Sequence, residues 1–310
     1  MDRILSLIRA TPFGYAEEVV KAFLINVLRT GPIPSHLSFV MDGNRRYAKK
    51  MGLPLADGHS AGANALADVL QLCFRLGVKQ ATVYAFSKEN FKRPKAEVDT
   101  LFSLMKDKLL LAVTEKEFCE NFNCRVRIIG DRNMIPADVL KDLERIEADT
   151  AKYTEHTLFF AFPYTSRDDI AHAMRSIVKK VENEELDADE ISEQTMENNF
   201  YYNGEAEKVD ILVRTSGHTR LSDYMLWQSH QESVIEFSNV LWPEYKFCQA
   251  WWTIFQWSYF KTLAIQDAEV MELKKVEKES VKERYTDPIP NMNTIQHPPF
   301  ASVTKVTKPE

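Results

Sequence analysis

The sequence predicts an α/β fold with a central, mostly parallel β-sheet flanked by helices. Short runs rich in β-branched and aromatic residues recur along the chain, and each is followed by a stretch with helical periodicity. This alternation is typical of βαβ units, whose strands run parallel. A chain of 310 residues, 45% of them hydrophobic, can bury the large core that such a fold needs.

Five strands and five helices are expected to alternate. The strands are predicted at residues 37–41, 81–86, 125–130, 157–162 and 209–214. The helices are predicted at residues 60–76, 96–120, 136–152, 166–183 and 221–231. The acidic segment 182–190 is interpreted as a solvated loop, and the polar, Pro-rich stretch after Asp287 as disordered. We therefore divide the chain into an N-terminal helix (1–30), one main domain (31–285) and a tail (286–310).

The N-terminal segment is amphipathic. Apolar residues repeat there at helical spacing, namely Val20, Phe23, Leu24, Val27 and Leu28. No segment reaches the ~20 apolar residues that a transmembrane helix needs. Two interpretations stay open for this helix, which either packs on its own domain or lies on a membrane surface.

Composition narrows the class of protein. The formal net charge of −6 argues against nucleic acid as a main partner. The four cysteines show no metal-ligand spacing, and we expect them to be reduced and mostly packed.

The segment 36–48 is the most informative part of the chain. A buried strand ends at the turn Asp42-Gly43-Asn44 and continues into a helix that starts with Arg45 and Arg46. Glycine permits close approach of the backbone, and helix-start N–H groups with two arginines favour an anion such as phosphate. An aspartate would repel a diphosphate there unless a divalent cation bridges them, so Mg²⁺ is implied. The alternative is that Asp42 merely caps the helix.

Polar, small or basic residues follow all five predicted strands. Because ligands of parallel sheets collect beyond the carboxyl ends of the strands, the site is expected at this edge. The segments are Asp42-Gly43-Asn44, Ser87-Lys88-Glu89-Asn90, Gly130-Asp131, Tyr164-Thr165-Ser166-Arg167 and Arg214-Thr215-Ser216-Gly217.

These motifs resemble those of the cis-prenyltransferases, which include undecaprenyl and dehydrodolichyl diphosphate synthases. The resemblance spans about residues 36–245 and is highly specific as a set. The Arg-Thr-Ser-Gly and Tyr-Thr-Ser-Arg forms look like the eukaryotic, fungal branch of dehydrodolichyl diphosphate synthase catalytic subunits. The matching segments are HLSFVMDGNRRYAKK (36–50), GHSAG (58–62), YAFSKENFKRP (84–94), RIIGD (127–131), DILVRTSGHTRLSDYMLWQ (210–228) and VLWPEY (240–245).

The resemblance implies a reaction. Isopentenyl diphosphate is condensed repeatedly onto an allylic diphosphate, commonly farnesyl diphosphate, with Mg²⁺ and a hydrophobic tunnel for the growing chain. The product would serve dolichol synthesis and protein glycosylation, at the cytosolic face of the endoplasmic reticulum membrane or a lipid droplet. A tunnel wall and a core wall are alike in sequence, so the apolar stripes Leu101, Phe102, Leu104, Met105, Leu109, Leu110, Phe159, Phe160 and Phe162 are left unassigned.

The family pattern also implies roles for individual residues. The isopentenyl diphosphate pocket matches Arg214, Arg220 and Ser222, while Ser87 and Asn90 match residues at the reacting centre. The allylic pocket matches Asp42, Gly43, Asn44, Arg45, Arg46, His59 and Arg93, with Asp42 as the metal ligand.

Structural interpretations compete with these roles. Arg214 and Arg220 can instead form salt bridges with Asp223 or Glu232. Ser87 and Asn90 can belong to a plain turn, Asn44 can be a capping or turn residue, and His59 can be an ordinary helix-start histidine. Glu89 is interpreted as structural. His218 stands where the family usually has Glu.

One missing motif predicts a partner. Homodimeric family members end in Arg-x-Gly, which reaches a neighbouring active site, and no such motif follows residue 245. The resemblance therefore implies a catalytically silent, Nogo-B-receptor-like subunit, with the aromatic stretch 247–260 as the interface. That stretch can alternatively be a buried helix of a monomer, or the chain can be a homodimer. Two other functions stay open, a silent family subunit and an isoprenoid-binding module without turnover.

Overall fold

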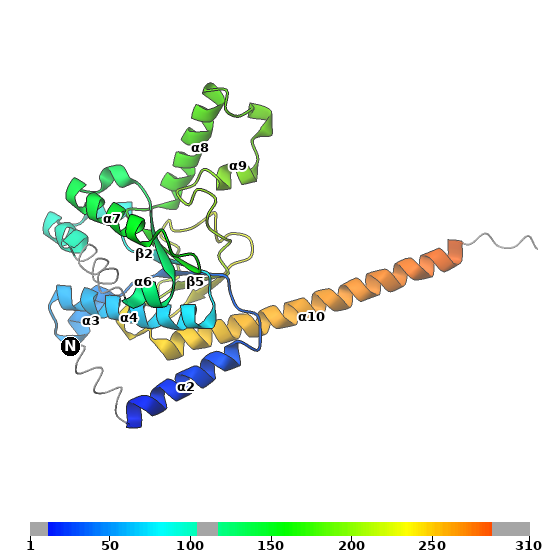
Figure 1. Cartoon of the computed structure of the whole chain (residues 1–310), viewed down its shortest axis with the longest axis horizontal. Helices are drawn as coiled ribbons and strands as arrows, with labels where there is room; N and C mark the ends of the chain where they lie inside the picture. Colours follow the sequence, from blue (N-terminus) through cyan, green and yellow to red (C-terminus); the bar gives the residue numbers. More distant parts are fainter. Residues whose placement is uncertain (1–11, 104–116, 287–310) are drawn as a thin grey trace, which may run out of the picture. The chain divides into compact units, whose positions relative to one another are not determined.

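The computed structural model describes residues 12–103 and 117–286 of the chain. The chain separates into two compact units, Met1–Thr262 and Leu263–Glu310. The first unit contains every strand described below, with helices around them (Figure 1). The described part of the second unit, residues 263–286, is the remainder of one long helix.

The first unit is built on a six-stranded sheet in which all neighbouring strands are parallel. Its order is β3-β4-β2-β1-β5-β6. The predicted α/β class and the five predicted strands are confirmed, while the sixth was missed. The strands are β1 (His36–Val40), β2 (Gln80–Tyr84), β3 (Cys124–Ile129), β4 (His156–Ala161), β5 (Ile211–Arg214) and β6 (Val234–Phe237).

Alternation along the strands creates two buried faces. Leu37 and Phe39 of β1 belong to a large core, and Val40 belongs to a smaller core on the other face. Because side chains of a strand point alternately to opposite faces, a sheet covered on both sides is apolar at nearly every position. This explains why β1 and β5 are buried along their whole length.

The predicted helices mostly form where expected. Residues 95–103 are helical and α6 is Glu117–Asn121, so both ends of predicted helix 96–120 are helical and its middle lies outside the described residues. The acidic segment 182–190 is mainly exposed loop with the short turn η3 (Ala188–Glu190). The other helices are α3 (Asn44–Met51), α4 (Leu55–Leu76), α7 (Ala137–Thr150), α8 (Ser166–Glu182) and α9 (Glu193–Glu197).

The helix predicted at 221–231 is wrong. The segment forms turns, and Ser222, Asp223 and Met225 have positive φ angles of 54°, 58° and 46°. Tertiary bonds favour this path, because the Asp223 carbonyl accepts from Ser166 N at 2.7 Å and the buried Tyr224 hydroxyl lies 2.7 Å from Ser38 Oγ. Local periodicity could not anticipate partners so far away along the chain.

The N-terminal helix α2 (Pro12–Leu28) is packed at one end. Ile25 and Leu28 are buried, and the Leu24 carbonyl accepts a hydrogen bond from Trp251 Nε1 at 2.9 Å. Closer to its start, α2 exposes four apolar side chains, namely Tyr15, Val19, Val20 and Phe23. The interpretation as a helix packed on its own domain therefore holds for the last turns of α2, and the exposed stripe keeps the membrane interpretation open.

Helix α10 (Phe247–Thr286) begins in the aromatic stretch. Within the first unit its Ile254 and Trp257 are buried, whereas Trp252, Tyr259 and Phe260 are more than half exposed. The buried-helix interpretation is thus correct for one side of the stretch only. In the part of the chain that the structure describes, no helix has the length and hydropathy required to cross a bilayer. Of the four free cysteines, Cys248 is exposed and the other three are buried.

Candidate active site

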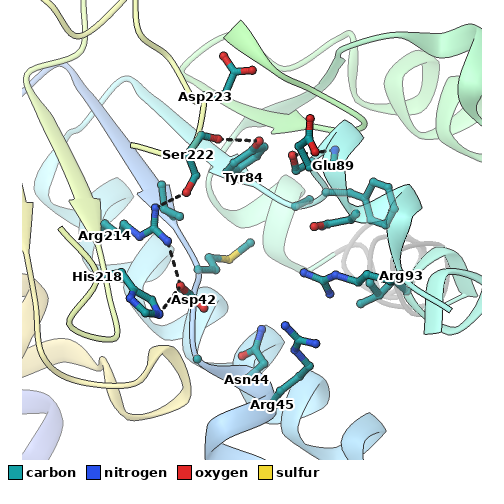
Figure 2. A pocket seen from close by; sticks show the side chains of 18 of the residues that line it. Asp42, Asn44, Arg45, Tyr84, Glu89, Arg93, Arg214, His218, Ser222 and Asp223 are labelled. Atoms are coloured by element: carbon teal, nitrogen blue, oxygen red, sulfur yellow. Dashed lines mark hydrogen bonds and ion pairs between the residues drawn. The ribbon is translucent and has the colours of Figure 1, made fainter. Parts of the chain in front are cut away.

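A cavity of about 930 Å³ lies at the carboxyl ends of β1, β2 and β5. It brings together residues that are up to 180 positions apart in the chain (Figure 2). All twelve residues singled out from the sequence line this one cavity, namely Asp42, Gly43, Asn44, Arg45, Arg46, His59, Ser87, Asn90, Arg93, Arg214, Arg220 and Ser222. Their individual roles stay predictions.

Asp42 lies two residues after the end of β1, and it lines the cavity. Its Oδ2 lies 3.1 Å from Arg214 Nη2 and 4.0 Å from His218 Nε2, and its Oδ1 lies 3.5 Å from Arg46 Nη2. The capping interpretation is wrong, because the N-cap residue of α3 is Gly43 and no side chain caps that helix. The Asp42 side chain therefore faces cations, and one third of it is accessible to solvent.

Gly43 is required by the turn that joins β1 to α3. Its φ is 112°, and a Cβ atom there would lie 2.9 Å from Ser216 Oγ and 3.1 Å from a Leu241 methyl carbon. A residue with a side chain would thus be strained and would displace the β5 turn. Glycine at position 43 thus allows the turn before α3 to pack closely against Ser216 and Leu241.

Arg214 ends β5 and is almost completely buried, with its side chain 4% exposed. Besides Asp42, its guanidinium donates hydrogen bonds to Ser222 Oγ at 2.6 Å and to the Arg220 carbonyl. The predicted alternative, a salt bridge of Arg214 with Asp223, is wrong, because Asp223 pairs with Arg167 at 2.9 Å. The buried Arg214 therefore holds the 214–222 loop against Asp42.

Arg220 is the exposed cation of this loop. Among the residues that the structure describes, no acidic side chain pairs with it, so the predicted Glu232 salt bridge is not formed. An unpaired guanidinium at the mouth of a cavity is free to bind an incoming anion.

The opposite wall of the cavity carries Arg93, Arg45 and His59. Arg93 and Arg45 share the Glu97 carboxylate at 2.9 and 3.5 Å. His59 Nε2 is buried without a hydrogen-bond partner among the described residues. Burial, followed by the nearby Arg93 guanidinium, lowers the pKa of His59 below its ordinary value of 6.5. His59 is therefore neutral at pH 7 and able to accept or donate one hydrogen bond.

Asn44 begins α3 with an amide oxygen that is buried and unpartnered. Gly62 of α4 makes room for it, since a Cβ at that position would lie 2.3 Å from Asn44 Oδ1. The close packing of α3 on α4 thus fixes the Asn44 amide at the cavity wall. The capping interpretation of Asn44 is wrong, because the N-cap position belongs to Gly43.

Ser87 and Asn90 lie on the short 3₁₀ turn η1 (Lys88–Lys92) that follows β2. Ser87 Oγ accepts a hydrogen bond from Glu89 N at 3.2 Å, which leaves its hydroxyl proton available to a ligand. Glu89 pairs with Lys92, in agreement with its predicted structural role. The residues thus form a capped turn whose side chains line the cavity, so the turn interpretation and the site interpretation are compatible.

The lining residues that were not predicted as site residues include Tyr84, Arg167 and Asp223. Tyr84 stacks on Tyr224 with ring centroids 4.2 Å apart, and its hydroxyl donates to the Tyr164 carbonyl at 3.2 Å. Arg167 and Asp223 form the ion pair at the cavity rim. Arg167 was visible as a strand-end residue. Tyr84 fell inside the predicted strand 81–86 and carried no signal that distinguished it from core, but in the structure it is the last residue of β2.

Cations dominate the cavity wall. The acidic lining residues are Asp42, Glu89 and Asp223, and the cationic ones are Arg45, Arg46, Lys49, Arg93, Arg167, Arg214 and Arg220. An excess of guanidinium groups around a cavity with apolar residues such as Met41, Phe86 and Leu101 on its wall suits a phosphorylated, hydrophobic ligand. Of the predicted apolar stripe, Phe102 is buried core and residues 104–110 lie outside the described residues.

The comparisons with known proteins agree with this geometry. The family model described as "putative undecaprenyl diphosphate synthase" matches residues 40–262. Dehydrodolichyl diphosphate synthase complex subunit SRT1 of Saccharomyces cerevisiae is 44% identical over 243 residues, covering 77% of this chain and 70% of that protein. The human subunit DHDDS is 42% identical over 234 residues, covering 76% and 68%.

A solved structure shares the fold. Lavandulyl diphosphate synthase from Lavandula x intermedia, in complex with dimethylallyl diphosphate, has a TM-score of 0.67 and is 28% identical. The match covers 73% of this chain and 95% of that one. The chain therefore belongs to the undecaprenyl diphosphate synthase family and is a cis-prenyltransferase.

Proposed function

We propose that this protein condenses isopentenyl diphosphate repeatedly onto farnesyl diphosphate and releases a long-chain dehydrodolichyl diphosphate. The observation that carries the proposal is the Asp42 carboxylate, held by Arg214 and Arg46 in a cavity where cations outnumber acids. Relatives named as dehydrodolichyl diphosphate synthase subunits support this product class.

The two diphosphates bind at different places in the cavity. The allylic diphosphate binds beside Asp42, Arg46 and the first amides of α3, with Arg93 opposite. The isopentenyl diphosphate binds Arg220 and Ser222 on the 214–222 loop, which Arg214 positions. This division places the two reacting carbons between the walls, next to Ser87 and Asn90, which orient the substrates as a proton leaves isopentenyl diphosphate.

The donor set fits Mg²⁺ that arrives with a diphosphate. Within the described ranges, no three His, Cys, Asp or Glu side chains are arranged to hold a metal. Asp42 would be the carboxylate that the protein contributes. Mg²⁺ is commonly bound by one or two carboxylates, several waters and substrate phosphates. When bound, it would neutralise the charge that develops on the leaving diphosphate. At position 218, where the family usually has Glu, this chain has a histidine. Its Nε2 lies 4.0 Å from the Asp42 carboxylate.

A second, catalytically silent subunit resembling the Nogo-B receptor completes the enzyme. The relatives' names describe each as a subunit of a complex, which supports a partner. The exposed Trp252, Tyr259 and Phe260 of α10 supply aromatic area of the kind that dominates interface energetics. The partner would contribute the Arg-x-Gly tail that the family resemblance implies.

The assembled enzyme works on the cytosolic face of the endoplasmic reticulum membrane, or on lipid droplets, and supplies dolichol for protein glycosylation. The exposed stripe Tyr15, Val19, Val20 and Phe23 of α2 gives an apolar helix face that can lie in a membrane surface. A polyprenyl product is insoluble in water, so release into a bilayer is favoured by its burial.

Two other functions are weaker. A silent subunit has no need for a carboxylate held among arginines, and an isoprenoid-binding module has no need for two diphosphate-binding walls. The predicted site residues are present around one cavity, and this favours an enzyme over a silent subunit or a binding module. They are Asp42, Arg46, Arg93, Arg214, Arg220 and Ser222.

The test is incubation of the purified chain with farnesyl and radiolabelled isopentenyl diphosphates and Mg²⁺, with and without its candidate partner, followed by sizing of the products. We expect weak synthesis by the chain alone and a marked gain with the partner. Full activity unchanged by the partner would contradict the two-subunit proposal. Absence of any product in all combinations would contradict the proposed condensation.

A further inference from the structure

Lys88 lies between the two residues proposed to act at the reacting centre, but its side chain turns away from the cavity. Its Nζ lies 2.9 Å from Asp131 Oδ2 and 2.8 Å from Asp168 Oδ1. Asp131 follows β3, and Asp168 is in the first turn of α8. One ammonium group therefore connects the turn after β2 to two other elements of the sheet edge.

Both carboxylates are fixed by further contacts. Asp168 Oδ2 accepts a hydrogen bond from the Tyr201 hydroxyl at 2.8 Å, and Asp131 Oδ1 accepts one from Asn133 N at 3.2 Å. All three charged side chains are only 19–22% exposed. Without Lys88, two partly buried carboxylates would converge on the same point without a cation, which is unfavourable.

Besides these ion pairs, the ring of Phe91 anchors the far end of the turn, 5.0 Å from the Phe86 ring and 5.9 Å from the Phe102 ring, and a few backbone contacts hold its start. Ser87 forms an isolated bridge with Tyr164, and Lys88 N donates to the Tyr164 carbonyl at 3.3 Å. Within the turn, Asn90 N donates to the Ser87 carbonyl at 2.8 Å. Short 3₁₀ segments have poor hydrogen-bond geometry, so their orientation depends on contacts with neighbouring elements.

We propose that Lys88 is a positioning residue for prenyl transfer, because its ion pairs with Asp131 and Asp168 hold the Ser87–Asn90 turn in register with the substrate cavity. The proposal rests on the roles of Ser87 and Asn90 given above. Removing the ammonium group leaves both pocket walls intact and lets the turn shift, so the chemical step slows while substrate binding persists.

The link is maintained across the neutral pH range. Partial burial opposes the charge of Lys88, but its hydrogen bonds to Asp168 and Asp131 outweigh burial and raise its pKa above the ordinary 10.5. Partial burial likewise opposes ionisation of Asp131, but the bond from Lys88 outweighs it, so the pKa of Asp131 lies below its ordinary value. Lys88 and Asp131 therefore both carry their charges at neutral pH.

The test compares steady-state kinetics of Lys88→Met, Asp168→Asn and Lys88→Arg with the wild-type protein. We expect Lys88→Met to lower kcat about tenfold or more while the KM for each substrate changes less than about threefold, as for an interaction that matters in the transition state. Asp168→Asn, which removes one of the two ion pairs, should lower kcat by a smaller factor. Lys88→Arg should restore most of the activity.

Lys92→Met is the matched control, because Lys92 is on the same turn, pairs with Glu89 and is 79% exposed. We expect its kcat to equal that of the wild type. A kcat for folded Lys88→Met within threefold of the wild type would overturn the proposal, as would equal losses in Lys88→Met and Lys92→Met. If Lys88→Met fails to fold, Asp168→Asn decides: a kcat lower than that of Lys92→Met supports the proposal, and a kcat equal to that of Lys92→Met would overturn it.

Hydrogen exchange separates this proposal from the proposed function. The amides of residues 87–93 should exchange faster in Lys88→Met or Asp168→Asn than in Lys92→Met, whether or not the protein turns over substrate. Inactive wild-type protein with this exchange pattern would refute the condensation reaction and leave the anchor supported. Unchanged exchange in both anchor variants would refute the anchor itself.

Discussion

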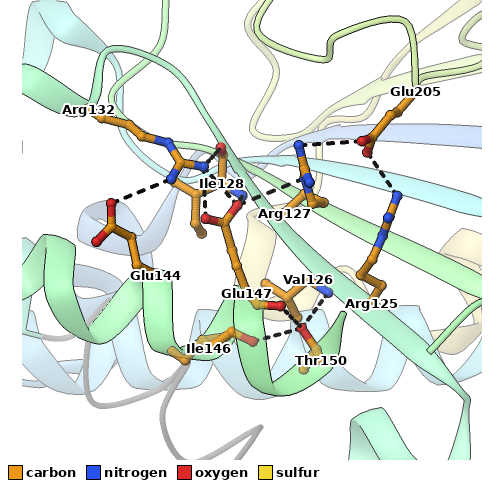
Figure 3. A network of polar contacts seen from close by, with 10 residues as sticks. All are labelled: Arg125, Val126, Arg127, Ile128, Arg132, Glu144, Ile146, Glu147, Thr150 and Glu205. Carbon is orange, nitrogen blue, oxygen red and sulfur yellow. Dashed lines mark hydrogen bonds and ion pairs between the residues drawn. The ribbon is translucent and has the colours of Figure 1, made fainter. Parts of the chain in front are cut away.

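Two clusters of arginines in the first unit differ in how far neighbouring carboxylates balance their charge. On β3, Arg125 pairs with Glu205 at 2.8 Å, and Arg127 lies within 4.0 Å of both Glu205 and Glu147 (Figure 3). Just after β3, Arg132 pairs with Glu147 at 2.8 Å and with Glu144 at 3.9 Å, so three arginines face three glutamates. In the cavity beside β1 and β5, cations outnumber carboxylates, and Arg46 and Arg214 share Asp42 alone.

The difference separates a structural cluster from a binding cluster. Glu147 also accepts a hydrogen bond from Ile128 N at 2.7 Å, so this carboxylate ties α7 to β3 while it neutralises arginines. A self-neutralised network attracts no anion, whereas uncompensated guanidinium groups in a cavity attract one strongly. Residue composition alone would rank the two clusters alike, and charge balance tells them apart.

The largest effect is expected for Asp42→Ala, which tests whether the cavity cluster is the binding cluster. Loss of the carboxylate proposed to hold the metal should cost several kcal/mol of transition-state stabilisation, or roughly a thousandfold in turnover. Product formation is measured with farnesyl and isopentenyl diphosphates, and circular dichroism verifies that the variant is folded. Near-normal turnover by a folded variant would refute the assignment of Asp42.

Arg220→Ala tests the uncompensated cation. Losing a charge-assisted contact costs roughly 1.5–3 kcal/mol, so the KM for isopentenyl diphosphate should rise about ten- to a hundredfold. The KM for farnesyl diphosphate should change much less, because that substrate binds the other wall. Equal increases in both constants would show that the cavity is not divided as proposed.

Glu147→Gln tests the self-neutralised cluster. Its side chain is 14% exposed, so loss of its charge should lower the free energy of unfolding by about 1–2 kcal/mol. Denaturant titration measures that change, and the kinetic constants should match those of the wild type. A loss of kcat without a loss of stability would mean that the β3 network takes part in the reaction.

The smallest expected effect concerns two histidines. Burial, followed by the nearby Arg93 guanidinium, lowers the pKa of His59, and bound pyrophosphate with Mg²⁺ should raise that pKa, as neighbouring anions do. The pKa of His172, beside Asp168 and Arg175, is lowered by burial and should not respond. NMR titration of both rings measures this, with His59→Gln to assign the signal.

The sign of the effect on stability follows from the lowered pKa of His59. Without ligand, its neutral form is favoured in the folded state, so it contributes stability above pH 6.5 that is lost as the pH falls toward its folded value. Bound pyrophosphate should reduce that loss. His172 lines a second cavity together with Arg127 and Arg132 of the other cluster. If pyrophosphate changed the pKa of His59 and that of His172 equally, the distinction between the two clusters would be wrong.

Local sequence patterns predicted five of the six strands but not the edge strand β6. The strands β1 to β5 carry short runs rich in β-branched and aromatic residues, and their positions were correct to within one or two residues. β6 contains Glu236 and is not fully buried at any of its four positions, so its sequence resembles that of a loop, whereas β5, which has the same length, is buried throughout. The wrong helix at 221–231 has the opposite cause, because helical spacing there is overridden by bonds from Asp223 and Tyr224 to distant segments.

The membership of the cavity could be predicted, but its contacts could not. Strand-end residues share an edge in any parallel sheet, which is why Asp42, Ser87 and Arg214 were found together. The pairing of Lys88 with Asp131 and Asp168 depends on how β2, β3 and α8 are brought together, and no local pattern reports that. The same holds for Tyr84, whose stacking on Tyr224 joins residues 140 positions apart.

The sequence by itself determined the alternation of strands and helices, the turn that needs Gly43 and the family motifs, because apolar periodicity and turn chemistry are local properties of the chain. Only the tertiary structure decided the strand order β3-β4-β2-β1-β5-β6, and through it which charges meet. β1 and β5 are neighbours in the sheet, so Asp42 and Arg214 form an ion pair across 172 positions, while the arginines of β3 find glutamates. Electrostatic interactions act over a few ångströms in space and are indifferent to distance along the chain, so charge balance belongs to the fold.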